Sequence, residues 1–443
     1  MARTYAIETF GCQMNVHDSE QMAGLLEQAG YEPARSPDSA DLMVLNTCSV
    51  RERAEEKLYS RLGELRRANT GRARPQAIAV TGCVAQQEGR ALLKRAPFLS
   101  VIAGTRGERR IAWLVEESAR TGLPAADIDL RSTLSFPLGV AHRADPVRAS
   151  VTILEGCNDV CAFCVVPYTR GREHMRPVAD ILEEVRGAVS TGHREILLLG
   201  QIVNDYQAPD DPACDFADLL ARVNEVPGVA RIRFASPHPR HVGRRLIQAI
   251  RNLPRVCKHL HLPVQSGSTR ILAAMRRRHS REEYLELVDR VRAEVPGIAL
   301  STDMIVGFPG EGEEDFAETL SLTRTVRYHS MFSFKYSERP NTFASKHLEN
   351  LVPEEEKARR LQVLQELQRS IQLELHRQAV GTVLEVLADS TSRRDDRELS
   401  GRTTGNVVVN FPGPRELVGQ LVDVSIRRAG PNSLRGELTG PVS

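Results

Sequence analysis

The sequence of 443 residues lacks any long apolar run. No stretch approaches the roughly 18 consecutive apolar residues that a membrane-spanning helix needs, and the opening segment MARTYAIETF holds no apolar signal core. An excess of one charge is also missing, because 59 basic residues stand against 57 acidic ones, for a net charge of +2. We therefore expect a cytoplasmic protein without a membrane partner, and broad polybasic binding of nucleic acid is not indicated.

The overall composition is otherwise that of a globular protein, with 41% hydrophobic and 26% charged residues, which argues against a mainly disordered chain. At about 150 residues per domain, the length suggests two to four domains, with three as the central estimate. The unusual count is eight cysteines. In a cytosolic protein, cysteines in this number are more often metal ligands or catalysts than a disulfide framework.

Three cysteines are spread evenly through the first part of the chain. Cys12, Cys48 and Cys83 are separated by 36 and 35 residues, and each follows a strand-like segment and precedes a helical pattern. The strands are predicted at 5–10, 42–46 and 77–80, and the helices at 18–29, 51–67 and 86–95. A period of about 35 residues is one βα unit. Because carboxyl ends of parallel strands share one edge, the three thiols should converge on one ligand site; the alternative is three small buried apolar residues.

Three further cysteines, Cys157, Cys161 and Cys164, form a C-x3-C-x2-C loop after a predicted strand at 151–154. A structural zinc site usually has four ligands, commonly in two pairs. No second pair of cysteines is near in the sequence, and the spacing from Cys164 to His174 is unusual for a fourth ligand. An iron–sulfur cube normally takes four thiolates, so three leave one iron open. This spacing, with Phe163 before the last cysteine, is the signature of radical S-adenosylmethionine (SAM) enzymes, in which electron transfer into SAM releases a 5′-deoxyadenosyl radical.

The pattern downstream predicts a partial barrel around this loop. Strands are expected at 195–199, 231–235, 259–262, 299–306 and 331–336, and helices at 178–191, 216–225, 242–251, 281–294 and 314–326. With the cysteine-bearing strand these make six βα units, fewer than the eight of a closed barrel. Glycine and small polar residues at strand ends suit close approach to a ligand. The candidate SAM contacts, with ordinary loop hydrogen bonding as the alternative, are Phe163, Gly200, Gln201, Ser236, Gln265, Ser266 and Asp303.

The C-terminal part begins with one long predicted helix, 354–377, and then changes to short strand-like runs at 383–388, 405–411 and 421–426. Such runs predict a small, OB-like β-barrel, a class that often binds nucleic acid. The segment carries almost no net charge, so a merely structural cap stays the alternative.

These motifs together resemble the methylthiotransferase family of radical SAM enzymes over nearly the whole chain. The phrases at 11–15, 18–19, 45–52 and 82–89 look like the family's cluster domain, 156–171 looks like its radical SAM core, and 399–402 and 431–436 look like its TRAM domain. The resemblance implies an α/β chain: an N-terminal parallel α/β cluster domain (1–120), a linker (121–142), a partial (β/α)6 barrel (143–376) and a small all-β barrel (377–443). Ile202 and Asn341 depart from the family pattern, which usually has Asn and Gly there.

The phrases around Cys12 and Cys48 resemble the branch of the family that acts on tRNA. The resemblance implies that sulfur and a methyl group are installed at C2 of dimethylallyl-modified adenosine beside the anticodon. That carbon carries an unactivated C–H bond, which acid–base catalysis cannot break. One SAM would be the methyl donor and another the radical source. Cys157, Cys161 and Cys164 would hold a SAM-chelating [4Fe–4S] cluster, and Cys12, Cys48 and Cys83 a second one that carries sulfur.

The resemblance also implies partners: the anticodon stem-loop of tRNA, and an electron donor such as flavodoxin or ferredoxin. We expect a monomer. An unpaired base should enter a pocket while basic side chains hold phosphates; each candidate could instead be an ordinary surface charge. The candidates are Arg170, Arg276, Arg277, Arg278, Arg402 and Arg435. Two alternatives stay open: methylthiolation of a ribosomal-protein side chain, and a non-enzymatic iron–sulfur or zinc-bound RNA-binding protein. Cys214 and Cys257 fit neither triad and are expected to be inert.

Overall fold

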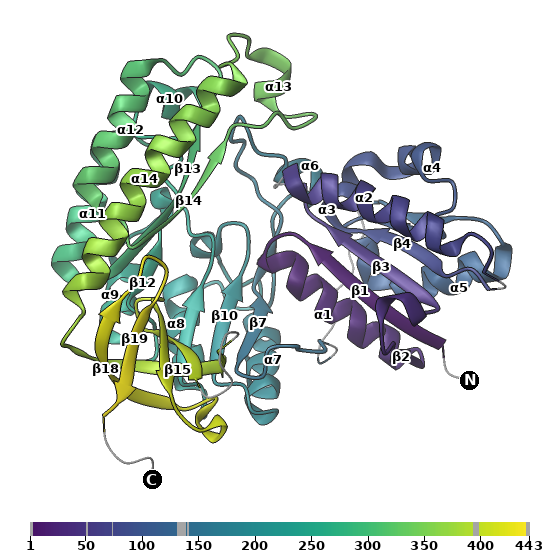
Figure 1. The fold of residues 1–443 in the computed structure, drawn as a ribbon, viewed down its shortest axis with the longest axis horizontal. Coiled ribbons are helices and arrows are strands. Elements are labelled where there is room, and N and C mark those ends of the chain that lie inside the picture. The colour runs from purple at the N-terminus through teal and green to yellow at the C-terminus, as the bar shows by residue number, and fades with distance from the viewer. Residues whose placement is uncertain are drawn as a thin grey trace.

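The computed structural model describes residues 3–49, 52–72, 74–130, 139, 141–392 and 398–439. The chain runs from an N-terminal α/β unit through a larger central α/β unit to a small β-barrel (Figure 1). This arrangement confirms the predicted fold class. The exact bounds drawn between the domains, with the linker at 121–142, stay a prediction.

The N-terminal unit is a six-stranded parallel sheet with helices on both faces. The strand order is β2-β1-β3-β4-β5-β6. Its central strand β3 is fully buried, as expected of a parallel sheet covered on both sides. The strands are β1 (Arg3–Phe10), β2 (Tyr31–Pro33), β3 (Leu42–Thr47), β4 (Ala77–Thr81), β5 (Val101–Ala103) and β6 (Ala125–Asp127); the helices are α1 (Gln13–Gln28), α2 (Glu52–Asn69), α3 (Gly82–Glu88), α4 (Leu92–Arg95) and α5 (Ile111–Thr121).

The central unit contains two three-stranded parallel sheets, ordered β11-β10-β7 and β12-β13-β14. A β-bridge between Ile232 and Val256 links them, so the six strands form an open half-barrel. The strands are β7 (Arg148–Thr152), β10 (Glu195–Leu199), β11 (Arg231–Phe234), β12 (His259–His261), β13 (Ala299–Val306) and β14 (Ser330–Lys335). The outer helices are α7 (Val178–Ser190), α8 (Phe216–Glu225), α9 (Arg244–Asn252), α11 (Arg281–Glu294) and α12 (Glu313–Val326).

The two faces of this half-barrel differ in what they contact. Ile196 and Leu198 of β10 and Met304 of β13 are buried with residues of the outer helices in one large core. Because side chains alternate along a strand, the intervening residues point to the inner face. Shorter elements lie in the segments that follow the strands: β8 (Leu154–Glu155), β9 (His174–Met175), α6 (Val166–Thr169), α10 (Thr269–Ala274) and α13 (Phe343–His347).

The helix α14 (Glu354–Gln378) packs on β14 and α12 and leads into a closed barrel of order β15-β16-β17-β19-β18. The strands are β15 (Val383–Thr391), β16 (Glu398–Thr403), β17 (Val408–Pro412), β18 (Leu421–Ala429) and β19 (Leu434–Leu438). The strand expected at 405–411 begins only at Val408. Asn406 has φ +66° and the Thr403 N–H donates to the Val407 carbonyl, so the first residues of the run form a tight turn instead.

The C-terminal barrel docks on the amino ends of β10 and β11. Arg233 donates from Nη2 to the Thr403 carbonyl oxygen at 2.7 Å and from Nε to Glu195 Oε2 at 2.8 Å. Arg231 pairs with Glu385 of β15 at 3.0 Å. This contact is therefore on the opposite side of the half-barrel from the loops that follow the strands.

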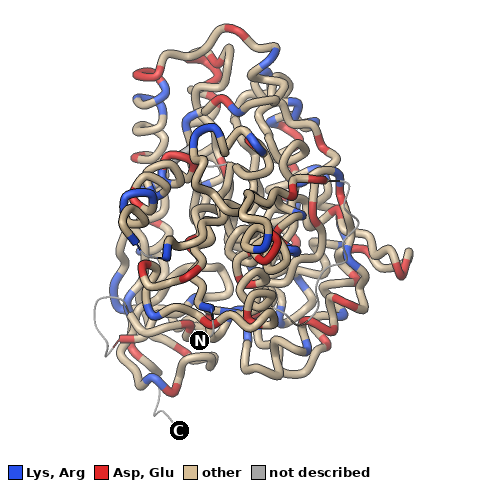
Figure 2. Tube along the Cα trace, turned by 90° about the vertical axis from the view of Figure 1, so that its right-hand side faces the viewer, with Lys and Arg blue, Asp and Glu red and all other residues tan. Residues whose placement is uncertain are grey.

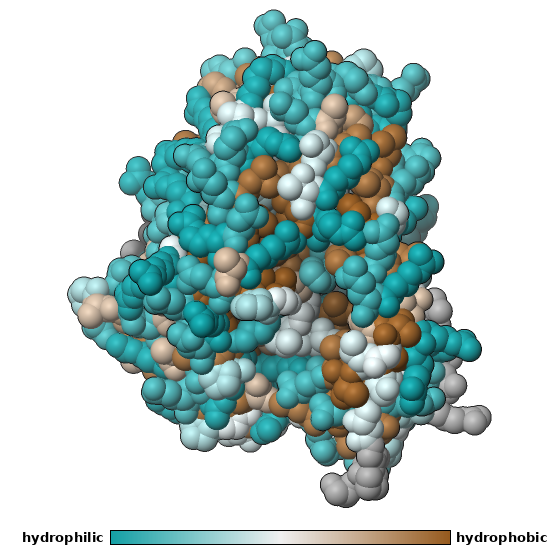
Figure 3. All heavy atoms as spheres, turned by 90° about the vertical axis from the view of Figure 1, so that its left-hand side faces the viewer, coloured by the Kyte–Doolittle hydropathy of each residue, from teal (hydrophilic) through white to brown (hydrophobic). Residues whose placement is uncertain are grey.

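Among the residues described, none of the helices is both long and apolar enough to cross a membrane. Positive and negative residues are interspersed along the chain (Figure 2), and hydrophilic residues cover most of the face formed by the outer helices of the central unit (Figure 3).

Candidate functional site

The first cysteine triad lies at the carboxyl ends of three adjacent strands, β1, β3 and β4. Cys12 is the N-cap of α1, Cys48 follows β3, and Cys83 lies in the first turn of α3. The backbone N–H of Cys48 donates to the Phe10 carbonyl at 2.9 Å, which fixes the second loop against the first. The predicted convergence of three thiols separated in sequence is therefore what the fold produces.

Close packing at this edge requires glycine. A Cβ on Gly11 would lie 2.7 Å from Cys48 Cβ, and one on Gly82 would lie 2.4 Å from the Thr47 carbonyl oxygen. Gly82 also has φ +88°, in the left-handed region that glycine adopts without steric cost. The two glycines that precede Cys12 and Cys83 thus let the loops approach one another.

The pKa values of Cys12 and Cys83 depend on their neighbours in the first triad. A hydrogen bond with Cys48 is the main cause that lowers the pKa of Cys12 to about 6, with burial acting in the opposite direction and Arg170 assisting. Burial raises the pKa of Cys83, and the nearby Arg170 partly offsets this. Two of the three thiols are thus within electrostatic reach of the same guanidinium.

Two asparagines that sequence reasoning did not select support this triad. Asn15 Oδ1 accepts a hydrogen bond from Cys12 Sγ at 3.2 Å, and its Nδ2 donates to Asn46 Oδ1 at 3.2 Å. Asn46 Nδ2 donates back to the Asn15 carbonyl at 2.8 Å and to Ser19 Oγ at 3.0 Å. Both asparagines are fully buried. They lie within the phrases that carry the family resemblance, near Cys12 and Cys48, and this position is the sequence feature that could have identified them.

The second triad lies on one loop after β8. Cys157 N–H donates to the Gly171 carbonyl and Cys164 N–H to the Cys161 carbonyl, each at 3.1 Å. Between them, Ala162 is held on both sides, by Met275 at 2.9 Å and Ala344 at 2.8 Å. The loop is thus fixed by backbone contacts to two distant segments.

Burial of the thiols and one neighbouring guanidinium are the main influences on this loop. Burial raises the pKa of Cys157 and of Cys164 to about 12, and the neighbouring thiols act in the same direction. Arg277 Nη1 lies 3.6 Å from Cys161 Sγ, close enough to donate to the thiol or balance a thiolate. Three neighbouring thiols beside a guanidinium form a donor set suited to a cluster with an overall negative charge.

The donor chemistry fits an iron–sulfur cube better than a single metal ion. Across the described ranges, no three His, Cys, Asp or Glu side chains are grouped as ligands of one ion. His174, the fourth ligand of the zinc alternative, is exposed on β9. The thiolates of a cube bind different iron atoms, so they remain further apart than the ligands of one ion. Each site offers three neighbouring thiols: Cys12 interacts with Cys48 and with Cys83, and Cys157, Cys161 and Cys164 interact with one another.

The two triads lie on either side of one contact between the N-terminal and central units. Helix α3, which bears Cys83, packs against α6, which follows Cys164, and Cys83 contributes to the raised pKa of Cys164. Thr105 Oγ1 donates to the Thr169 carbonyl at 2.6 Å across the same contact. The two triads are therefore neighbours across this contact.

The structure places the candidate SAM contacts along the inner side and the strand ends of the half-barrel. Gly200 and Ser266 are buried, and Gln265 holds a left-handed φ of +77° while its backbone bridges to Asp303 and Ile305 of β13. Ser236 is exposed, with φ +60°, and Gln201 is half-buried. Phe163 instead packs in an apolar cluster with residues such as Phe308. The individual roles stay predictions.

The six candidate RNA contacts do not gather on one surface. Arg170 and Arg277 are buried, the first against Asp18 and the second against Cys161 and the Pro263 carbonyl. Arg276 and Arg278 are exposed near the second triad, whereas Arg402 and Arg435 lie in the C-terminal barrel beside Asp389 and Glu398. Arg276, Arg278 and Arg435 are therefore accessible to solvent, whereas Arg170 and Arg277 are buried.

Two positions that depart from the family pattern are accommodated. Asn341 has φ +69°, in the left-handed region that Asn tolerates better than most residues. Ile202 is buried at the end of the loop that follows Gln201. Both loops thus keep a defined conformation with the residues present here.

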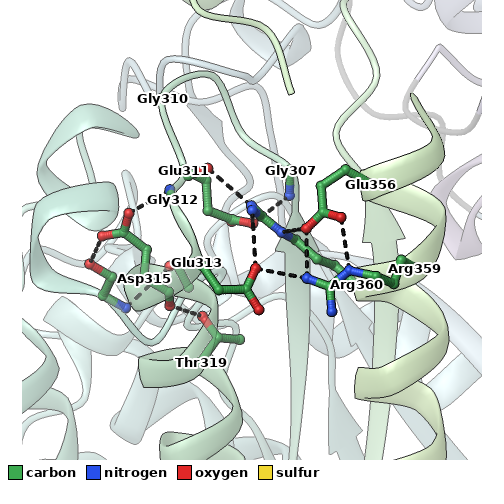
Figure 4. Close-up of polar contacts among 12 residues, drawn as sticks. Gly307, Gly310, Glu311, Gly312, Glu313, Asp315, Thr319, Glu356, Arg359 and Arg360 are labelled. Carbon is green, nitrogen blue, oxygen red and sulfur yellow. Dashed lines mark hydrogen bonds and ion pairs between the residues drawn. The ribbon is translucent and has the colours of Figure 1, made fainter. Parts of the chain in front are cut away.

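A buried ion-pair network, missed by sequence reasoning, supports the loop after β13 (Figure 4). Glu311 Oε1 accepts from the Gly307 N–H at 2.8 Å and from Arg360 Nη1 of α14 at 2.7 Å. Asp315 accepts from Ser268 Oγ at 2.7 Å and so joins this loop to the one after β12. Helix α14 therefore positions two loops at the carboxyl end of the half-barrel.

Comparison with known proteins agrees with this architecture. Family models match residues 4–104 (Uncharacterized protein family UPF0004), 151–323 (Radical SAM superfamily) and 377–439 (TRAM domain). The solved structure of the radical S-adenosylmethionine methyltransferase TsrM from Kitasatospora setae covers 88% of this chain and 82% of its own, with a TM-score of 0.55 at 14% identity. At that identity the likeness shows the fold alone. The half-barrel and its C-x3-C-x2-C loop thus define a radical SAM enzyme.

Curated relatives match from end to end. The tRNA-2-methylthio-N(6)-dimethylallyladenosine synthases of Solibacter usitatus, Acidovorax sp. and Geotalea uraniireducens are 43%, 46% and 47% identical to this chain. Each alignment covers at least 98% of this chain and 98% of the relative. The chain belongs to this family of methylthiotransferases.

Proposed function

We propose that this enzyme converts N6-dimethylallyladenosine next to the anticodon of tRNA into its 2-methylthio derivative. The observation that carries the proposal is the pair of cysteine triads, each one ligand short of a cube, on either side of a single domain contact. Full-length relatives named for the same reaction on tRNA support the RNA substrate over the ribosomal-protein alternative. The TRAM match at 377–439 supports it further.

Each triad has a separate role in this proposal. Cys157, Cys161 and Cys164 would hold the [4Fe–4S] cluster that binds SAM, and Cys12, Cys48 and Cys83 would hold a second cluster that carries sulfur. When bound, these groups supply radical generation and a sulfur atom. Burial raises the pKa of Cys157 and Cys164, so binding of a cluster would release protons from these thiols.

The protein's own residues provide position and exclusion of water. The buried glycine edge around Gly11 and Gly82 and the asparagine pair Asn15–Asn46 fix the first triad. The backbone bonds of Ala162 fix the second. Candidate SAM contacts follow from strand-end position: Gly200, Gln201, Ser236, Gln265, Ser266 and Asp303. We further infer that a flavodoxin or ferredoxin supplies the electron, and that the enzyme acts as a monomer in the cytoplasm, where its tRNA is found.

The test is anaerobic reconstitution of the full chain with iron and sulfide, followed by reaction with SAM, a reductant and an anticodon stem-loop that contains dimethylallyladenosine. Nucleoside mass spectrometry should show the 2-methylthio product, with SAM consumed both as methyl donor and as radical source. SAM cleavage with no change in the RNA would refute the substrate assignment. Bound zinc without iron would refute the radical chemistry.

A further inference from the structure

The inner face of β14 exposes two aromatic side chains. Phe332 is 55% exposed and Phe334 is 39% exposed. They are two residues apart on one strand, so they share a face, and the register places Phe332 beside Asp303 and Phe334 beside Ile305 of β13. The other face of β14 is covered, because Met331 packs on the main core and Ser333 accepts a hydrogen bond from Gln365 of α14. The two rings therefore point into the open half-barrel.

Two exposed phenylalanines on the edge strand β14 are unfavourable in water, because removal of apolar surface from water lowers the free energy. An exposed apolar patch rimmed by polar residues commonly marks a binding site. Polar groups adjoin it: His261 packs edge-on to the Phe332 ring, at a centroid distance of 6.2 Å, and His261 Nε2 lies 3.5 Å from Asp303 Oδ1. The face thus combines an aromatic surface with a polar pair at one edge.

Both cysteine triads border this interior. Just beyond the carboxyl end of β14, Tyr336 packs in the apolar cluster that contains Ala162, which lies between Cys161 and Cys164. On the inner face of the other sheet, Leu197 and Leu199 of β10 pack with Met14 of α1 and against Cys12. A ligand resting on the two phenylalanines would therefore lie on the inner side of the half-barrel, which residues next to both triads adjoin.

We propose that Phe332 and Phe334 form the wall on which the target adenine rests, together with its apolar dimethylallyl group, during modification. This inference rests on the proposed function and specifies where its substrate binds. An unpaired RNA base offers a π-face that stacks on aromatic side chains. The dimethylallyl group adds apolar surface that an unmodified adenine lacks, so this wall favours the modified base. His261 and Asp303 supply polar atoms for the ring edge.

The test compares Phe332→Ala and Phe334→Ala with a control, Trp113→Ala, which removes another exposed aromatic residue on the outer surface of α5 in the N-terminal unit. Binding of fluorescently labelled anticodon stem-loops, with dimethylallyladenosine or with unmodified adenosine, is measured anaerobically by anisotropy on the iron-loaded full chain. Each phenylalanine variant should weaken binding of the modified hairpin about tenfold and reduce its preference over the unmodified one. Trp113→Ala should bind as wild type does.

Phe332→Leu and Phe334→Leu keep apolar volume without the ring, and should fall between wild type and the alanine variants. If the alanine variants bind both hairpins like wild type, the inference is wrong. It is equally wrong if they lose affinity for SAM while RNA affinity is unchanged, because the wall would then serve the cofactor. Failure of the proposed function is seen separately, as absence of 2-methylthio product with the wild-type enzyme.

Discussion

Arg170 of the central unit donates from Nη2 to Oδ2 of Asp18 in α1 at 2.5 Å, and both side chains are buried. A second pair, Arg109 with Glu155 at 2.6 Å, crosses the same contact. Between them lies Glu108, whose pKa is raised well above its ordinary value, first by burial and then by Asp18. These pairs fix how the two cysteine-bearing units meet, and so the relation between the two triads.

Removing one partner of this pair should destabilise the protein. Arg170→Ala leaves Asp18 buried and unpaired, at a cost of about 3–5 kcal/mol, and should lower the thermal midpoint measured by calorimetry. Arg172→Ala, an exposed arginine two residues further on, is the matched control and should leave the midpoint unchanged. The double variant Asp18→Leu with Arg170→Met should recover much of the loss. An unchanged midpoint in Arg170→Ala would contradict the structural role.

The two neighbouring arginines of α14 make a second matched comparison. Arg360 is buried and pairs with Glu311 at 2.7 Å, whereas Arg359 is 48% exposed and pairs with Glu356 and Glu313. We expect Arg360→Ala to lower the free energy of unfolding by about 3–5 kcal/mol, because it leaves a buried carboxylate without its ion-pair partner. Arg359→Ala should lower it by less than about 1 kcal/mol. Denaturant unfolding measures both. Equal losses would show that burial of Glu311 is not what makes this pair matter.

Arg360 also shows where prediction from the sequence ends. The strands at 195–199 and 299–306 and the helix at 281–294 are confirmed at their predicted bounds, because apolar periodicity is a local property of the chain. The partner of Arg360 is 49 residues away. Its spacing of four residues from Leu364 places Arg360 on the buried face of α14, but local sequence does not show which residue it pairs with.

The same reason separates the features of the candidate site that local sequence can locate from those that it cannot. Each cysteine triad could be located because strand–cysteine–helix phasing and C-x3-C-x2-C spacing are short-range patterns. Arg170 was selected for RNA from its charge alone, and its buried partner Asp18 is 152 residues away.

β16 and β19 were not predicted, because β19 gains its place through parallel pairing with β17 and antiparallel pairing with β18, which only the closed barrel defines.

Stability in acid should depend on Glu195, which lies between Arg233 and Arg148 where the C-terminal barrel docks. Burial alone would raise its pKa, but the two guanidinium groups outweigh burial and lower the pKa to about 2, below the ordinary value of 4.5. The unfolded chain therefore takes up this proton first, so the stabilisation is complete above pH 4.5 and is lost as the pH falls towards 2. Thermal midpoints between those limits should fall more steeply for wild type than for Glu195→Gln. Parallel curves would disprove the role of Glu195.

The separate roles of the two triads give the sharpest prediction. Wild type should bind about eight iron atoms per chain, and Cys48→Ala and Cys157→Ala about four each. Cys214→Ala should bind the wild-type amount, because this buried thiol belongs to neither triad. Anaerobic iron and sulfide analysis measures this before any reaction is run.

Activity then separates the two sites. Cys157→Ala should lose SAM cleavage altogether, since it removes a ligand from the SAM-binding loop. Cys48→Ala should stop sulfur insertion yet continue some uncoupled cleavage of SAM, because the radical-generating loop is untouched. Chromatography of 5′-deoxyadenosine and mass spectrometry of the RNA measure the two outcomes independently. Loss of all SAM cleavage in folded Cys48→Ala protein would contradict these separate roles. SAM cleavage at the second triad would then depend on the first triad, through the contact that Arg170 and Asp18 make.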